Sequence, residues 1–157
     1  MNKKKKVGLV LGGGGVKGAT LVGVLAALEK FNIPINLIAG VSVGSIVGAM
    51  YSYYRDAKII ADKILSTEVQ DFADFSFWNY FKLPFSKSGL CKGKNLERFL
   101  VHQLPDCDIK DLHIPLIVTA TNLETLTSVI IQEGNLIEAL MASAALPPFY
   151  APVKFYD

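Results

Sequence analysis

A serine lies between two glycines in the segment Gly40-Val41-Ser42-Val43-Gly44, which has the pattern G-x-S-x-G. In this pattern the serine takes a strained backbone conformation between a strand and a helix, and the glycines leave room for neighbouring segments. The hydroxyl then projects beyond the strand end, where it can attack an acyl carbon. Ser42 is therefore the predicted nucleophile, with Gly40 and Gly44 as the glycines of its turn, although the pattern also arises by chance in turns of small residues.

A second glycine motif comes earlier in the chain and reads Gly13-Gly14-Gly15-Val16-Lys17-Gly18. It follows a short apolar run, where a strand is expected to turn into a helix. Glycine permits positive φ and a close approach of the backbone to a ligand, and amides at a helix start favour negative charge. The loop can therefore hold either a dinucleotide pyrophosphate or the oxyanion of an acyl-transfer intermediate.

The residues after the second expected strand separate these two interpretations. A dinucleotide fold expects an acidic residue there to bind the ribose, whereas no Asp or Glu occurs between residues 31 and 54. Acyl transfer needs a nucleophile and a site for the oxyanion, and the two motifs supply both. We therefore predict an oxyanion hole built from Gly13, Gly14, Gly15, Lys17 and Gly18. Lys17 either adds positive potential or caps nearby carbonyl groups.

A serine hydroxyl needs a base, because it is a weak nucleophile at its free pKa. The chain has two histidines, His102 and His113. We expect His102 on a helix surface before Pro105, and His113 in a loop before the strand at residue 115. Neither is a good candidate for a Ser–His–Asp triad.

The apolar pattern predicts an α/β fold. Residues 7–11 and 37–41 read as strands buried in a parallel sheet, and residues 16–28 and 43–54 as the helices that follow them. Further along the chain we expect a helix over 56–66, then a helix that is capped by Asn95 and ended by Pro105. Residues 115–122 and 128–132 read as strands, the first within the sheet and the second as an edge strand or the second half of a hairpin. A last helix is expected over 136–145.

Composition indicates one globular domain over residues 1–157. The chain is 51% hydrophobic with a net charge of +2, and its basic residues are mostly dispersed, so no nucleic-acid partner is expected. Cys91 and Cys107 lie far apart without a histidine cluster, which argues against a zinc site and a disulfide scaffold and indicates reduced thiols in a cytoplasmic protein. No metal or other cofactor is expected. The lysine run at residues 3–6 is a solvated tail or a contact with anionic lipid.

Two other stretches could bear on lipid contact. Residues 31–54 carry no charge and are long enough to span a bilayer, but their glycines and Pro34 favour a buried strand followed by a buried helix. Half of the residues from 72 to 85 are aromatic. This aromatic segment is interpreted as an acyl-chain pocket or lid, as core under a long connection, or as a peripheral membrane contact.

The strand at 7–11, the two glycine motifs and the segment at 142–147 resemble the bacterial-type patatin-like phospholipase family in order and spacing, over nearly the whole chain. The resemblance implies a three-layer α/β/α sandwich with a mainly parallel central sheet. It also implies hydrolysis of carboxylic esters of phospholipids or lysophospholipids through a Ser–Asp dyad, with the glycine loop as the oxyanion hole.

The family's base is an Asp followed by Gly, shortly beyond a proline-rich segment that here spans 147–153. No Asp of the chain precedes a Gly, and Asp157 lies too close to Pro152 to fill the role. We therefore expect a C-terminally incomplete patatin-like domain with little or no esterase activity as an isolated chain. The alternatives are a catalytically silent lipid-binding fragment and a nucleotide-binding module; the oligomeric state stays open.

Overall fold

Four strands form one sheet in the order β1-β2-β3-β4. The computed structural model describes residues 6–67, 93–147 and 150–155. The strands are β1 (Gly8–Leu11), β2 (Leu37–Val41), β3 (Leu116–Asn122) and β4 (Thr127–Ile131). β1, β2 and β3 run parallel, and β4 folds back antiparallel on β3 as an edge hairpin. The predicted mainly parallel sheet and the predicted hairpin are confirmed.

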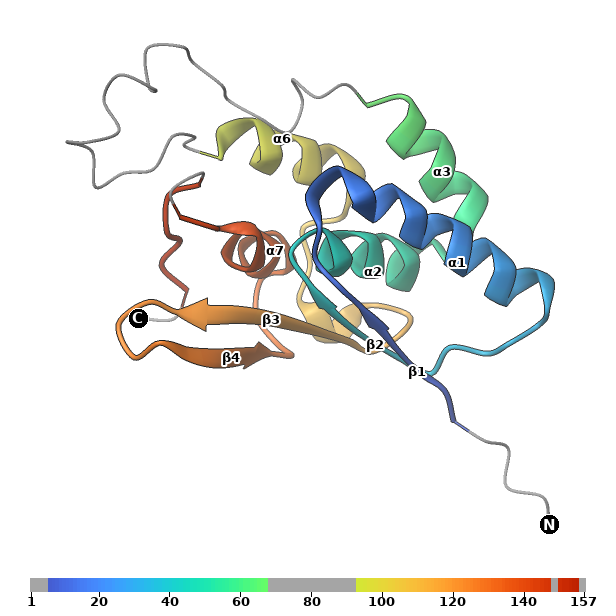
Figure 1. The fold of residues 1–157 in the computed structure, drawn as a ribbon, viewed down its shortest axis with the longest axis horizontal. Coiled ribbons are helices and arrows are strands. Elements are labelled where there is room, and N and C mark those ends of the chain that lie inside the picture. The colour runs from blue at the N-terminus through green and yellow to red at the C-terminus, as the bar shows by residue number, and fades with distance from the viewer. Residues whose placement is uncertain (1–5, 68–92, 148–149, 156–157) are drawn as a thin grey trace.

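The helices lie on one face of this sheet (Figure 1). They are η1 (Gly15–Gly18), α1 (Ala19–Lys30), α2 (Val43–Tyr54), α3 (Ala57–Leu65), α6 (Lys94–Gln103), η3 (Ile109–Asp111) and α7 (Leu136–Ala144). The predicted α/β class is confirmed, and the described residues supply two layers of the predicted sandwich.

Side-chain alternation along the strands separates a buried face from an exposed one. Leu11, Ile38 and Val118 point toward the helices and are almost fully buried. On the opposite face, Val10 is 80% exposed and Ile130 64% exposed. The buried face therefore fixes the register of the sheet, and with it the position of the strand ends.

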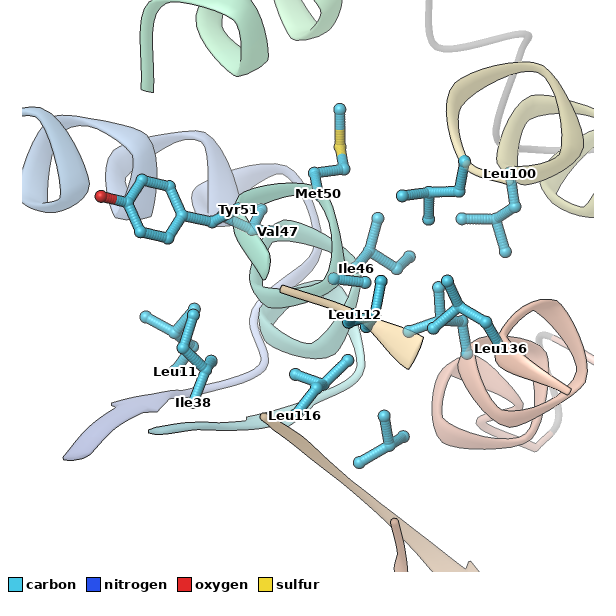
Figure 2. Close-up of a cluster of buried hydrophobic side chains, with 14 of the residues drawn as sticks. Leu11, Ile38, Ile46, Val47, Met50, Tyr51, Leu100, Leu112, Leu116 and Leu136 are labelled. Atoms are coloured by element: carbon cyan, nitrogen blue, oxygen red, sulfur yellow. The ribbon is translucent and has the colours of Figure 1, made fainter. Parts of the chain in front are cut away.

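Helix α2 is the central element of the core, and nine of its twelve residues are buried. Gly48 makes this possible, because a Cβ there would lie 2.9 Å from Ile38 and 3.3 Å from Leu116 on the sheet. Figure 2 shows Ile46, Val47 and Met50 of α2 above the sheet residues. Burial of each large side chain stabilises the fold by roughly 1.5–3 kcal/mol.

The uncharged stretch at 31–54 is thus β2 followed by the buried helix α2, as predicted. Among the described residues, no helix is both long and apolar enough to cross a bilayer.

Two predictions at helix starts were less accurate. The expected helix over 16–28 is divided into the short turn η1 and α1, which continues to Lys30. The predicted Asn95 cap was wrong, because α6 begins at Lys94 with Gly93 as its cap, two residues earlier than predicted. Gly93 has φ 74°, a conformation that glycine adopts at no steric cost, and its carbonyl accepts the Glu97 amide at 2.9 Å. The Asn95 side chain instead accepts from Arg98.

Several predicted features lie outside the described residues. They are the aromatic segment 72–85, Cys91, residues 3–5 of the lysine run and Asp157.

Candidate active site

Ser42 occupies the turn between β2 and α2, at the carboxyl end of its strand. Its backbone has φ 54° and ψ −128°, outside the regular helical and strand regions. A residue with a side chain in such a conformation costs roughly 1–3 kcal/mol and persists only where its surroundings impose it. The turn therefore has the strained geometry that the G-x-S-x-G pattern predicts.

Hydrogen bonds hold both backbone groups of Ser42. Its N–H donates to the hydroxyl of Ser143, at 2.8 Å. Its carbonyl accepts from the Ser45 hydroxyl at 2.6 Å and from the amides of Ser45 and Ile46 at 2.9 and 3.2 Å. These bonds offset the cost of the strained conformation and fix the direction in which the side chain leaves the backbone.

The two glycines of the turn have no space for a side chain. A Cβ at Gly40 would lie 2.5 Å from the Ser45 Cα. A Cβ at Gly44 would lie 2.3 Å from the Leu11 carbonyl oxygen and 2.6 Å from that of Gly12. Gly44 is therefore where α2 packs directly on the backbone at the end of β1.

The glycine loop lies against the same turn, as Figure 1 shows for the connections that follow β1 and β2. A Cβ at Gly13 would be 3.4 Å from the Ser42 Cβ, and one at Gly18 would be 2.3 Å from the Val43 Cγ2. The parallel pairing of β1 with β2 causes this proximity, since it brings both strand ends to one edge of the sheet. The structure thus brings the two predicted motifs together.

Within the described residues, the amides of Gly13 and Gly14 have no hydrogen-bond acceptor, and neither has the amide of Val43 at the start of α2. Gly14 and Gly15 have φ of 152° and 56°. The loop closes through the Lys17 amide, which donates to the Gly14 carbonyl at 3.2 Å, while the Lys17 side chain is exposed. Unpaired amides beside a half-buried hydroxyl can stabilise an anion that forms there.

The Ser42 hydroxyl makes no hydrogen bond to any described residue. His113 lies before β3, at the opposite end of the sheet from Ser42, and stacks on Tyr53 with ring centroids 6.2 Å apart. His102 is exposed on α6, and its Nδ1 donates to the Arg98 carbonyl at 2.7 Å. The part of the chain that the structure describes therefore does not identify the base.

Sequence reasoning missed the polar residues that support the turn. Ser143, Ser45 and Thr119 all bond to backbone around Ser42: the Thr119 hydroxyl donates to the Gly40 carbonyl at 3.2 Å. Ser45 lies one helical turn into α2 and could have been found from that spacing. Ser143 is 101 positions away from Ser42, and no local pattern indicates the contact.

A metal site or a reactive thiol would require particular side chains among the described residues. Across residues 6–67, 93–147 and 150–155, no group of three His, Cys, Asp or Glu side chains is placed to hold a metal ion. Cys107 is a free cysteine. Burial, together with the charges of Asp111, Asp106 and Asp108, raises the pKa of its thiol, which disfavours the reactive thiolate.

Two relatives named as a lysophospholipase and an esterase match nearly the whole chain. Lysophospholipase NTE1 of Lodderomyces elongisporus is 33% identical over 154 residues, covering 95% of this chain. Neuropathy target esterase sws of Drosophila persimilis is 28% identical over 147 residues, covering 94% of the chain. In both cases the match spans only 10% of the relative.

A solved structure and a family model extend these similarities. The crystal structure of the type III effector protein ExoU has a similar fold, with a TM-score of 0.56 and 16% identity, over 92% of this chain and 40% of the effector. The family model of the patatin-like phospholipases matches residues 9–157, which include the glycine loop, the serine turn and α7. The chain therefore belongs to the patatin-like phospholipase family.

Proposed function

We propose that this chain carries the nucleophile and oxyanion hole of a lipid acyl hydrolase, with Ser42 as the nucleophile. The observation that carries the proposal is the position of Ser42, which is held at positive φ with Gly13 against its Cβ. The amides of Gly13, of its neighbour Gly14 and of Val43, which follows Ser42, have no acceptor among the described residues. A nucleophile beside fixed backbone donors is the minimal apparatus for acyl transfer.

The reaction proceeds in two steps. The Ser42 Oγ attacks the ester carbonyl carbon and gives its proton to a base, and the amides stabilise the oxyanion that forms. The intermediate then collapses, the alcohol leaves with a proton, and an acyl-serine remains. Water hydrolyses this ester, which releases the fatty acid and returns the proton to Ser42. Loss of one oxyanion donor in such sites typically reduces kcat by about 10²–10³-fold.

We propose an aspartate as the base, in a Ser–Asp dyad. Membership of the patatin-like phospholipase family supports this choice, as do the positions of the two histidines. His113 is at the wrong end of β3, and the His102 ring bonds to its own helix.

The proposed substrates are phospholipids or lysophospholipids. The family description and the lysophospholipase name of the fungal relative support this class. The cytoplasmic location and the peripheral membrane contact stay predictions.

A catalytically silent lipid-binding protein is the second candidate. It is favoured by one specific observation, the Ser42 hydroxyl without a hydrogen-bonded base among the described residues. The nucleotide-binding alternative lacks an acidic ribose anchor after β2, because residues 31–54 carry no Asp or Glu.

Fluorophosphonate labelling separates the enzyme from the silent protein. We expect a fluorophosphonate probe to label the protein at its natural full length on Ser42, and Ser42→Ala to abolish both labelling and ester turnover. Ser128→Ala, an exposed serine on β4, is the matched control and is expected to behave like the wild type. Equal labelling of the wild type and Ser42→Ala would reject Ser42 as the nucleophile. A folded wild type that neither labels nor hydrolyses lysophospholipid would favour the silent protein.

A further inference from the structure

A single hydroxyl connects the nucleophile turn to two other elements of the fold. The Ser143 hydroxyl in the last turn of α7 accepts the Ser42 N–H at 2.8 Å and donates to the Thr119 carbonyl of β3 at 2.7 Å. A serine hydroxyl has one proton. Because Thr119 takes that proton, the lone pairs of the hydroxyl are available to the Ser42 N–H, and both bonds have a defined direction.

The Ser42 N–H has no other acceptor among the described residues. β2 ends at Val41 and α2 begins only at Val43, so neither the strand nor the helix supplies an acceptor for this amide. A half-buried amide that loses its acceptor is costly. The strained conformation of Ser42 is therefore supported at two points: Ser143 accepts its amide, and Ser45 donates to its carbonyl.

Helix α7 is itself firmly placed, so Ser143 is a fixed point. The Asn135 side chain caps the helix by accepting the Glu138 amide at 3.0 Å, and it donates to Asp106 at 2.7 Å. Leu136 and Leu140 are fully buried in the core. Figure 2 shows α7 beside the core, with Leu136 directed into it.

We infer that Ser143 is a positioning residue for the nucleophile, an inference that rests on the proposed function. It fixes the Ser42 amide and hence the direction of the Ser42 side chain. A displacement of about 1 Å in a reacting group can reduce a rate by about 10²-fold. The Ser143 hydroxyl bonds only backbone groups, those of Ser42 and Thr119, so we expect its loss to act through the position of Ser42, on the chemical step more than on substrate binding.

The test compares Ser143→Ala with Ser143→Thr, which keeps the hydroxyl, in the protein at its natural full length. We expect Ser143→Ala to lower kcat on a lysophospholipid by about 10- to 100-fold with KM within about twofold. The fluorophosphonate labelling rate falls in parallel, and Ser143→Thr recovers most of both. Ser143→Cys, which keeps the volume, replaces the alanine variant if that variant does not fold. Ser66→Ala is the matched control, because its hydroxyl also donates to a backbone carbonyl, that of Lys63 at 2.9 Å, in a different part of the fold.

Hydrogen exchange of the Ser42 amide provides a readout that is independent of activity. Ser143→Ala is expected to lower protection of this amide by about tenfold or more, whereas Ser66→Ala leaves it unchanged. A kcat within twofold of the wild type, with unchanged protection, overturns the inference. If the wild type neither labels nor turns over ester, the proposed function fails, and the exchange measurement still decides whether Ser143 anchors the amide.

Discussion

The two strand-to-helix turns of the site are held in opposite ways. The turn after β2 is crowded: neither Gly40 nor Gly44 has space for a Cβ, and Ser42 is bonded at both its amide and its carbonyl. The turn after β1 is open over its first residues, since a Cβ at Gly12 or Gly15 would meet nothing within 4 Å, and it becomes crowded only at Gly18, where α1 follows. Packing therefore fixes the nucleophile, whereas the shape of the glycine loop depends on backbone conformations that only glycine adopts easily.

The largest effect is expected at the contact between the two turns. In Gly44→Ala the new Cβ would clash with the backbone carbonyls of Leu11 and Gly12, which cannot move without shifting β1. We expect a loss of about 3 kcal/mol or more in the free energy of unfolding. Denaturant titration measures it, with Gly12→Ala as the control. If Gly44→Ala and Gly12→Ala unfold at the same denaturant concentration, then close packing of the two turns at Gly44 does not contribute to stability.

The crowded turn was also the more predictable one. Gly40 and Gly44 flank Ser42 at spacings that local chain geometry requires, and the apolar runs at β1 and β2 are long enough to indicate buried strands. Ser143 could not be predicted, because its contact depends on how α7 packs on β3. At α6, Asn95 satisfied the preference for a capping side chain, yet the positive φ of Gly93 decided where the helix begins. The Ser143 contact was therefore decided by tertiary packing, and the start of α6 by backbone conformation; sequence spacing indicated neither.

A second experiment compares two serines buried within α2. Both Ser45 and Ser52 are fully buried, but the Ser45 hydroxyl bonds the Ser42 carbonyl at 2.6 Å, whereas the Ser52 hydroxyl has no partner in the described part of the chain. We expect Ser45→Ala to destabilise the protein by about 1–2 kcal/mol and to slow fluorophosphonate labelling.

Ser52→Ala is expected to be neutral or slightly stabilising, because it removes an unsatisfied buried polar group. Thermal unfolding and labelling rates measure both variants. Equal destabilisation by the two substitutions would show that the support of the Ser42 carbonyl contributes nothing specific.

The open loop can be tested with a pair of glycines that differ in backbone conformation. Gly12 and Gly15 both have space for a Cβ, but only Gly15 has positive φ, at 56°. We expect Gly15→Ala to cost about 1 kcal/mol more than Gly12→Ala, which is roughly 2–4 °C in Tm for a domain of this size. Labelling of Ser42 is expected to slow more than this small loss implies, since the loop amides move. If both variants label at the wild-type rate, the loop is not the oxyanion hole.

The smallest effect concerns the far end of α2 and becomes visible only in alkali. Burial, followed by the hydrogen bond to Glu29 and the charges of Glu29 and Asp56, raises the pKa of Tyr51 from 10.0 to about 12. Glu29 also accepts the Ala57 amide at 2.9 Å, so it joins α1 to α3. The folded state then holds the tyrosine proton more tightly than the unfolded state.

The stability that Tyr51 provides is therefore complete below about pH 10 and is lost as the pH rises toward about 12. Tyr51→Phe removes the buried hydroxyl that interacts with Glu29 and is expected to cost about 1–2 kcal/mol at pH 8. The difference in unfolding free energy between wild type and variant should shrink between pH 10 and 12. Taking this difference cancels the titration of lysines, which both proteins share. A constant difference across that range would show that the folded state does not hold the Tyr51 proton more tightly than the unfolded state.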